Sequence, residues 1–257
     1  MRRDSFTSLQ QPLAKRLRPL VYALIAMVAF ILLLTWATLQ VQTALAGFLN
    51  GESLWSKAQK QVTIDLLNYA ATGDAADYAD FQGNYAILEA YRSAREKVLS
   101  GDFDYDEVEQ DLRRGGAIAV AIPKAIFLLD HFADSYFMEK ALREWRASDS
   151  AVAKLKVIAD ELHRSYADGS ISHAEIVRQR NRINRLNKLI RPHTNQFSMA
   201  LAQGAVTVGR VSFVSVMVLS AAAFFLWLLM ARRTLAGIRS SEERYRLLFD
   251  SAADAIV

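Results

Sequence analysis

Three arginines stand out among the residues that could do chemistry: Arg178, Arg182 and Arg185. Their spacings of four and three residues place them on one face of a helix. Forked guanidinium groups suit a carboxylate or a phosphate, so these side chains predict an anion-binding site. The alternative is a solvated face neutralised by the acidic segment 102–111 or by lipid headgroups, because like charges this close repel one another.

An aromatic stretch between residues 131 and 145 is the second candidate. It contains His131, Phe132, Tyr136, Phe137 and Trp145. These rings either pack in the core or form the wall of a small-molecule pocket between helices, where bundles often hold ligands. The candidate ligand-binding residues are therefore the three arginines and Trp145, for a small molecule or another periplasmic ligand.

No catalytic or metal-binding pattern is present in the sequence. The four histidines, His131, His163, His173 and His193, lack close metal-ligand spacing. There is no cysteine, which excludes disulfides and thiolate metal sites. A calcium loop in the acidic segment is an alternative, but its Asp-x-Asp-x-Asp spacing lacks the glycine and terminal glutamate of the EF-hand pattern. We expect no cofactor, no metal and no catalytic residue in this chain.

Two apolar runs determine the architecture around these residues. Residues 20–39 and 211–231 form runs of 20 and 21 residues without a charge. At about 1.5 Å per residue, each run matches the roughly 30 Å hydrocarbon core of a bilayer. We predict transmembrane helices at residues 20–41 and 210–231, with the lipid bilayer as partner. A cleaved signal peptide is the alternative for the first run, because Ala44-Leu45-Ala46 has a small-x-small form.

The distribution of charge predicts the orientation of the chain. Residues 1–19 carry a net charge of +4, whereas residues 42–209 carry 20 basic and 22 acidic side chains. Arg232, Arg233 and Arg239 follow the second run. By the positive-inside rule, the basic leader 1–19 and the C-terminus are cytoplasmic, and residues 42–209 lie outside a bacterial inner membrane. Because the basic excess lies at the membrane flanks, we predict no nucleic-acid partner.

Helical patterns fill the residues between the two runs. Proline occurs only four times, and apolar side chains recur at helical spacing. We predict an all-α fold in which a helical bundle at residues 42–209 is flanked by the two spans. Phe48, Trp55, Val62 and Tyr69 recur every seven residues, so the first span should continue as one helix that ends at Gly73.

Capping residues predict the helix boundaries in the first half of the bundle. Asp74 should cap a helix that runs to about Ser100. A short acidic helix should follow and end at Gly115-Gly116. Pro123 fits the first turn of a further helix, since its fixed backbone angle suits that position.

Similar signals divide the second half. Asp149 should cap a helix over residues 151–166. Ser172 and Glu175 form a capping box at the start of the last helix. Pro192 lies inside that helix and should kink or break it near residue 191, because proline removes one backbone donor and clashes with the preceding turn.

A helical connector is predicted at residues 232–244, directly after the second span. Leu235, Ile238, Glu242, Tyr245 and Phe249 follow a three-four spacing that continues beyond it. Glu242 is the only polar interruption, so this stretch could pair with its copy in a homodimer.

The segment 241–257 reads SEERYRLLFDSAADAIV. It resembles the first helix and turn of a PAS domain, in which Glu-Arg-Tyr-Arg-x-Leu-Phe and a later Asp-Ala-Ile are characteristic. The resemblance implies that residues 245–257 begin a PAS domain and stop before its sheet. Residues 55–60, Trp-Ser-Lys-Ala-Gln-Lys, are more loosely similar to helical input domains of bacterial sensors, although the acidic segment departs from that pattern.

These resemblances imply a transmembrane signal-transduction sensor. An extracytoplasmic stimulus would shift the bundle, and the second span would relay the shift to a cytoplasmic PAS domain. The favoured output module is a histidine kinase of a two-component system. The alternatives are a GGDEF or EAL enzyme of cyclic di-GMP turnover and a non-enzymatic, chemoreceptor-like protein.

Overall fold

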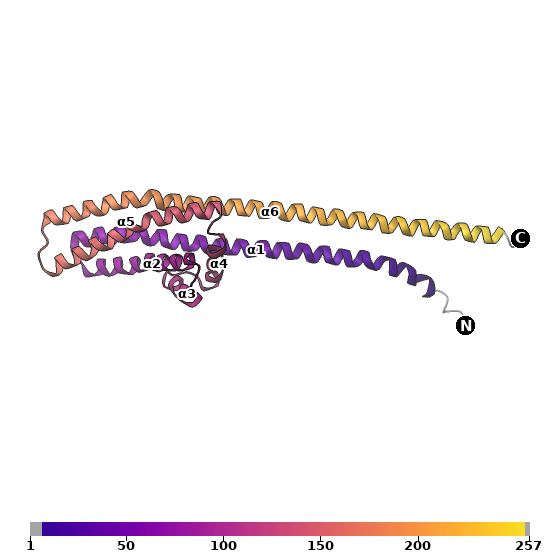
Figure 1. Cartoon of the computed structure of the whole chain (residues 1–257), viewed down its shortest axis with the longest axis horizontal. Helices are drawn as coiled ribbons and strands as arrows, with labels where there is room; N and C mark the ends of the chain where they lie inside the picture. The colour runs from indigo at the N-terminus through magenta and orange to yellow at the C-terminus, as the bar shows by residue number, and fades with distance from the viewer. Residues whose placement is uncertain (1–6, 255–257) are drawn as a thin grey trace. The chain divides into compact units, whose positions relative to one another are not determined.

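The structure is a computed structural model that describes the backbone of residues 7–254 and the side chains of residues 18–237. Every regular element in this range is helical (Figure 1). The elements are α1 (Thr7–Thr72), α2 (Ala75–Ser100), α3 (Tyr105–Arg114), the 3-10 helix η1 (Ala119–Ala121), α4 (Ile122–Phe132), α5 (Tyr136–Ala167) and α6 (His173–Asp254). The predicted all-α fold is therefore confirmed for the described residues.

The chain divides into two compact units. One unit is Gln40–Gly209, and it contains the main hydrophobic core. The other consists of the described parts of Met1–Leu39 and Arg210–Val257. Helices α1 and α6 each contribute residues to both units.

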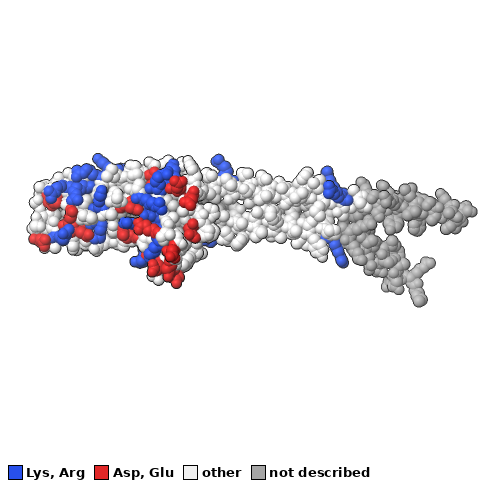
Figure 2. Space-filling model, in the orientation of Figure 1, with Lys and Arg blue, Asp and Glu red and all other residues white. Residues whose placement is uncertain are grey.

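Two helical segments are long and apolar enough to cross a membrane, Arg18–Thr72 in α1 and His173–Gly237 in α6. The most apolar window of each segment is entirely unburied within the protein. In Figure 2 the charged side chains gather over the helices of the unit Gln40–Gly209, while the apolar stretches of α1 and α6 are almost free of them. A core helix of a soluble protein would bury such a surface, so these stretches are compatible with a lipid surrounding.

The seven-residue stripe of α1 forms one side of the core, as predicted. Trp55, Val62 and Tyr69 are at most 2 % exposed. The helix ends at Thr72, and Gly73 follows with a left-handed φ of 67°. A Cβ atom at Gly73 would lie 2.5 Å from the Tyr166 ring, so both the backbone angle and the space require glycine.

Most of the predicted helix starts are confirmed. The Asp74 side chain accepts a hydrogen bond from the backbone N–H of Ala76 at 2.9 Å and caps α2. The backbone N–H of Glu175 donates to Ser172 Oγ at 3.2 Å at the start of α6. Pro123 lies in the first turn of α4. Local capping chemistry thus fixes these boundaries.

The prediction that Asp149 caps a helix is wrong. Helix α5 begins at Tyr136, directly after Ser135, so Asp149 lies in its interior. Its carboxylate accepts a hydrogen bond from the buried Arg95 guanidinium at 2.5 Å. A tertiary partner therefore uses the carboxylate that the sequence pattern assigned to the helix terminus.

Of the kink or break predicted near residue 191, the break is absent, since α6 continues through Pro192. Pro192 and Lys188 are both exposed. The Lys188 carbonyl loses its intrahelical donor at Pro192, and this turn lies on the exposed side of the helix.

The acidic segment 102–111 docks α3 on α2. Lys97 Nζ contacts Glu107 at 2.9 Å and Asp111 at 3.0 Å, and Arg114 pairs with Asp111. Among the described residues, no group of three or more His, Asp or Glu side chains is arranged to hold a metal ion. Two carboxylates of this segment, those of Glu107 and Asp111, thus attach α3 to α2.

The side chains of the PAS-like segment 241–257 lie outside the described part of the structure. Residues 255–257 lie outside it entirely. The backbone of α6 is helical up to Asp254. Side chains of the predicted leader up to residue 17 are likewise outside the described residues.

Candidate functional site

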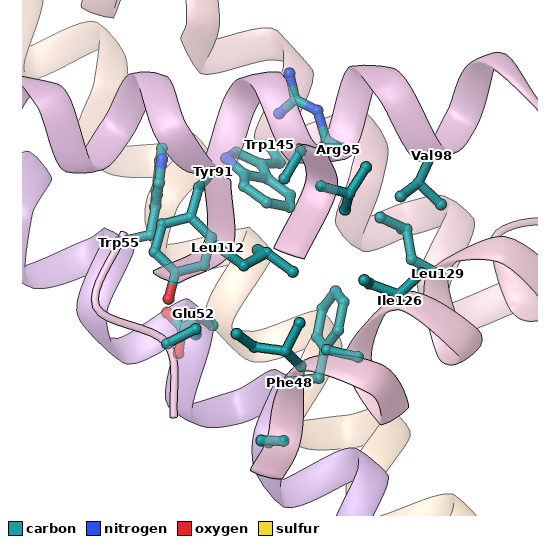
Figure 3. Close-up of a pocket in the computed structure, with 18 of the residues that line it drawn as sticks. Phe48, Glu52, Trp55, Tyr91, Arg95, Val98, Leu112, Ile126, Leu129 and Trp145 are labelled. Carbon is teal, nitrogen blue, oxygen red and sulfur yellow. The ribbon is translucent and has the colours of Figure 1, made fainter. Parts of the chain in front are cut away.

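A cavity of about 50 Å³ lies within the unit Gln40–Gly209. All six α-helices contribute to its wall, through Trp55 of α1, Tyr91 of α2, Leu112 of α3, Ile126 of α4, Trp145 of α5 and Phe197 of α6. Figure 3 shows aromatic and aliphatic side chains from several helices converging on it. Such a mostly apolar space with a few polar groups is typical of a small-molecule site.

Three aromatic rings form one side of the cavity. The rings of Trp55 and Trp145 meet edge to face with centroids 5.9 Å apart. The Phe197 ring stacks on Trp145 at 5.1 Å. Since these rings belong to α1, α5 and α6, the cavity wall joins the first and last helices of the chain.

Two glycines make room for the Tyr91 ring on the opposite side. A Cβ atom at Gly115 would lie 2.7 Å from a Tyr91 ring carbon, and one at Gly51 would lie 3.3 Å from another. Glycine is thus needed at Gly115 for close approach, because its φ of −70° is ordinary. The Gly115-Gly116 break that ends α3 therefore also seats Tyr91.

Three buried donors around the cavity lack a hydrogen-bond partner among the described residues. They are the Tyr91 hydroxyl, the Arg95 Nε–H and the Trp145 indole N–H. Burial raises the pKa of Tyr91 to about 12, so its hydroxyl keeps its proton at neutral pH. An unpaired buried donor is unfavourable by roughly 1–3 kcal/mol, and three around one cavity indicate that something else accepts their hydrogen bonds.

The remaining donors of Arg95 are used inside the protein. Its Nη2 donates to Asp149 Oδ2 at 2.5 Å, and its guanidinium carbon lies 4.5 Å from the centre of the Trp145 ring. Figure 3 shows the guanidinium directed away from the middle of the cavity. Burial raises the pKa of Asp149, and the hydrogen bond and charge of Arg95 oppose that shift.

Glu52 connects the cavity to α6. Its Oε1 accepts hydrogen bonds from Ser56 Oγ at 2.6 Å and from Ser198 Oγ. Ser198 follows Phe197, which lines the same cavity. Both a polar and an aromatic contact therefore link the cavity wall to the helix that contains the second apolar stretch.

The arginines predicted as an anion site lie elsewhere in the unit. Arg178 and Arg182 line a polar hollow that does not include Trp145. Arg178 pairs with Glu175, and Arg182 Nη1 contacts Glu161 at 2.6 Å. The structure thus brings two of the arginines together and leaves Trp145 in the aromatic cavity.

Carboxylates already match the charge of this hollow. Burial acts to raise the pKa of Glu161, but hydrogen bonds from Arg182 and Gln179 outweigh it and hold the pKa below its ordinary value. Arg185 is exposed and has no hydrogen-bond or ion-pair partner among the described side chains. Glu175 and Glu161, rather than the acidic segment, pair with Arg178 and Arg182.

A second hollow of about 320 Å³ is lined by Val41, Leu45, Phe127, Phe132 and other mostly apolar side chains. Phe127 and Phe132 are about half exposed, so the aromatic stretch after Pro123 is only partly core. Polar side chains reach this hollow only from Gln40 and Lys124. It offers few groups to orient a ligand, which makes the cavity at Tyr91 the better candidate site.

Sequence reasoning missed Tyr91, Arg95 and Glu52 as site residues. A signal for Arg95 was present: it lies on the buried stripe of α2 with Leu88, Tyr91 and Val98, at spacings of three and four. An arginine within an apolar stripe requires a buried partner, so this pattern points to a polar group inside the bundle. Glu52 had no comparable signal, because its contact with α6 is made by Ser198, which is distant in sequence.

No family model, no curated protein and no solved structure matches this chain. The candidate site therefore stands on its own geometry.

Proposed function

We propose that the protein is a bacterial transmembrane sensor whose cavity is the input site. The observation that carries this proposal is that α1 and α6, which contain the two apolar stretches, both supply side chains to the cavity wall. A change in the cavity would act directly on Phe197 of α6 and, through Glu52, on Ser198. The sequence resemblance to PAS domains and the basic flanks of the apolar runs support the same role.

In this proposal the unit Gln40–Gly209 lies outside the inner membrane and both termini lie in the cytoplasm. A homodimer relays a change in the packing of α6 to a cytoplasmic PAS domain, and from there to a histidine kinase. Moving such a two-state equilibrium from mostly off to mostly on requires about 5.5 kcal/mol of differential affinity. A few buried contacts supply energies of that size.

The relay is tested with cysteines introduced singly at positions 211–230, since the chain has none of its own. Ala125→Leu places a larger side chain at the cavity wall and mimics occupancy. Ala153→Leu is the matched control, because Ala153 is also half-buried but does not line the cavity. We expect Ala125→Leu to change the pattern of disulfide crosslinks between protomers, and Ala153→Leu to leave it unchanged. Identical patterns in all three proteins would refute the relay.

Orientation is tested separately with a single cysteine at the exposed Ser53. A membrane-impermeant maleimide added to intact spheroplasts should label this position. A cysteine introduced at position 8, in the leader, should react only after the membrane is opened. The reverse result would contradict the proposed topology.

A further inference from the structure

The unpaired groups around the cavity are donors, which restricts what the cavity accepts. The Trp145 indole and the Arg95 Nε–H only donate, and the Tyr91 hydroxyl also has a proton to give. Tyr91, Arg95 and Trp145 are 5 %, 1 % and 6 % exposed, so bulk water does not compensate them. An occupant must therefore carry a hydrogen-bond acceptor.

The charges next to the cavity argue against an ionic occupant. Arg95 is paired with Asp149, which leaves the Glu52 carboxylate as the uncompensated charge of the wall. An anion would face Glu52 in a mostly apolar space, where a charge without a partner is strongly unfavourable. A cation would leave the Tyr91 and Trp145 donors without an acceptor, Glu52 Oε1 already accepts hydrogen bonds from Ser56 and Ser198, and the Trp145 ring already holds the Arg95 guanidinium.

The size of the cavity sets an upper limit on the occupant. At about 50 Å³ it is well below the roughly 150 Å³ of a cavity that holds benzene. A six-membered ring does not fit without movement of the walls. A cavity needs roughly 10–15 Å³ on a comparable measure to hold one water, so the space suits a molecule with only a few heavy atoms.

We infer that this cavity binds a small uncharged molecule with a carbonyl or hydroxyl oxygen, which accepts a hydrogen bond from the Tyr91 hydroxyl or the Trp145 indole. The inference rests on the proposed function only in treating the cavity as the input site. A molecule of about four heavy atoms binds no tighter than a Kd on the order of tens of micromolar. The matching stimulus is then an abundant, small, neutral metabolite.

Four small probes of different charge test the inference: acetone, acetamide and acetate, with four heavy atoms each, and the smaller methylammonium. The full chain in lipid nanodiscs carries 5-fluorotryptophan at its four tryptophans, Trp36, Trp55, Trp145 and Trp227. Fluorine NMR then reports on the cavity through Trp55 and Trp145. Trp36 and Trp227, which do not line the cavity, are controls in the same sample.

Acetone and acetamide are expected to shift the Trp145 and Trp55 signals saturably at millimolar concentration, while the control signals stay in place. Tyr91→Phe, which keeps the ring and removes the hydroxyl, should weaken acetamide binding about fivefold. Saturable binding of acetate alone would show an anion site, and binding of methylammonium alone would show an aromatic cation cage. Either result would overturn the inference, as would the absence of any saturable shift, which would leave ordered water as the occupant.

The outcomes of this experiment and of the crosslinking experiment are independent, so the ligand class and the relay can be refuted separately. Binding of acetamide without any change in crosslinking at positions 211–230 would keep the ligand class and remove the relay. Altered crosslinking in Ala125→Leu together with binding of acetate alone would keep the relay and remove the ligand class.

Discussion

The guanidinium of Arg95 lies between the Trp145 ring, 4.5 Å from its centre, and the Asp149 carboxylate, 2.5 Å from Nη2. Arg95 belongs to α2 and both partners belong to α5, so one buried charge fastens the two helices beside the cavity. The charge is removed from water and is balanced mainly by these contacts, with the Glu96 carboxylate 3.8 Å from Nη2. Removing the contacts of Arg95 should therefore reduce the stability of the protein first and affect function only after that.

Arg95→Met is expected to lower the free energy of unfolding by about 3 kcal/mol, because Asp149 is left as a mostly buried carboxylate without its partner. Arg95→Met combined with Asp149→Asn should recover a large part of that loss. Chemical unfolding of the full chain in detergent, followed by tryptophan fluorescence, measures both. A double variant as unstable as the single one would mean that Arg95 acts through packing on Trp145 instead of through charge.

Two buried tyrosines differ in whether the hydroxyl has a partner. Tyr69 OH lies 3.0 Å from His163 Nδ1, whereas the Tyr91 hydroxyl has no partner among the described residues. Tyr69→Phe should therefore destabilise the protein by about 1 kcal/mol, and Tyr91→Phe should be neutral or stabilising. Thermal unfolding of both variants in the same lipid tests the difference. A loss in Tyr91→Phe equal to that in Tyr69→Phe would indicate that ordered water pairs with the Tyr91 hydroxyl.

Gly115 and Gly83 should respond oppositely to alanine. At Gly115 the new Cβ would lie 2.7 Å from the Tyr91 ring, so the ring must shift and the protein should lose about 1–3 kcal/mol. At Gly83, within α2, no atom other than those of the local helix backbone and the adjacent residues lies within 4 Å of the new Cβ. Gly83→Ala should stabilise by up to about 1 kcal/mol, because alanine restricts the unfolded chain. Equal effects at the two sites would show that Gly115 is not needed to seat Tyr91.

The sequence was sufficient where the cause of structure is local. The heptad stripe from Trp55 to Tyr69, the Asp74 cap and the Ser172 cap each follow from a pattern along one helix, and each is confirmed. The return bond of a capping box is not formed among the described residues, because the Glu175 carboxylate binds Arg178 and Gln179. The boundary at Asp149 failed because a residue distant in sequence, Arg95, binds its carboxylate. Local propensity gave no indication of that contact.

The candidate site was predictable only in part, for the same reason. Trp145 was recognised as a candidate pocket residue because it ends an aromatic stretch of the sequence. Trp145 and the three arginines were predicted as ligand-binding residues from their side-chain types alone. In the structure Trp145 of α5 and Arg182 of α6 line different hollows. Tyr91 and Glu52 become site residues only when six helices are packed together.

The attachment of α3 should depend on pH through Asp111. Burial alone would raise the pKa of Asp111, but hydrogen bonds from Ser93 and Lys97 and the charges of Lys97 and Arg114 outweigh it and hold the pKa below its ordinary value. A lowered carboxyl pKa contributes stability that is present above the pKa of the unfolded chain, near 4, and is lost as pH falls through the lower folded value. Asp111→Asn should therefore reduce the free energy of unfolding by about 2 kcal/mol at pH 7, and this difference from the wild type should shrink below pH 4.

Unfolding curves at pH 7 and pH 3 measure this difference, with Asp102→Asn as an exposed control without an ion pair. A difference of the same size at both pH values would mean that Asp111 contributes by packing, and that protonation does not weaken the contact between α2 and α3.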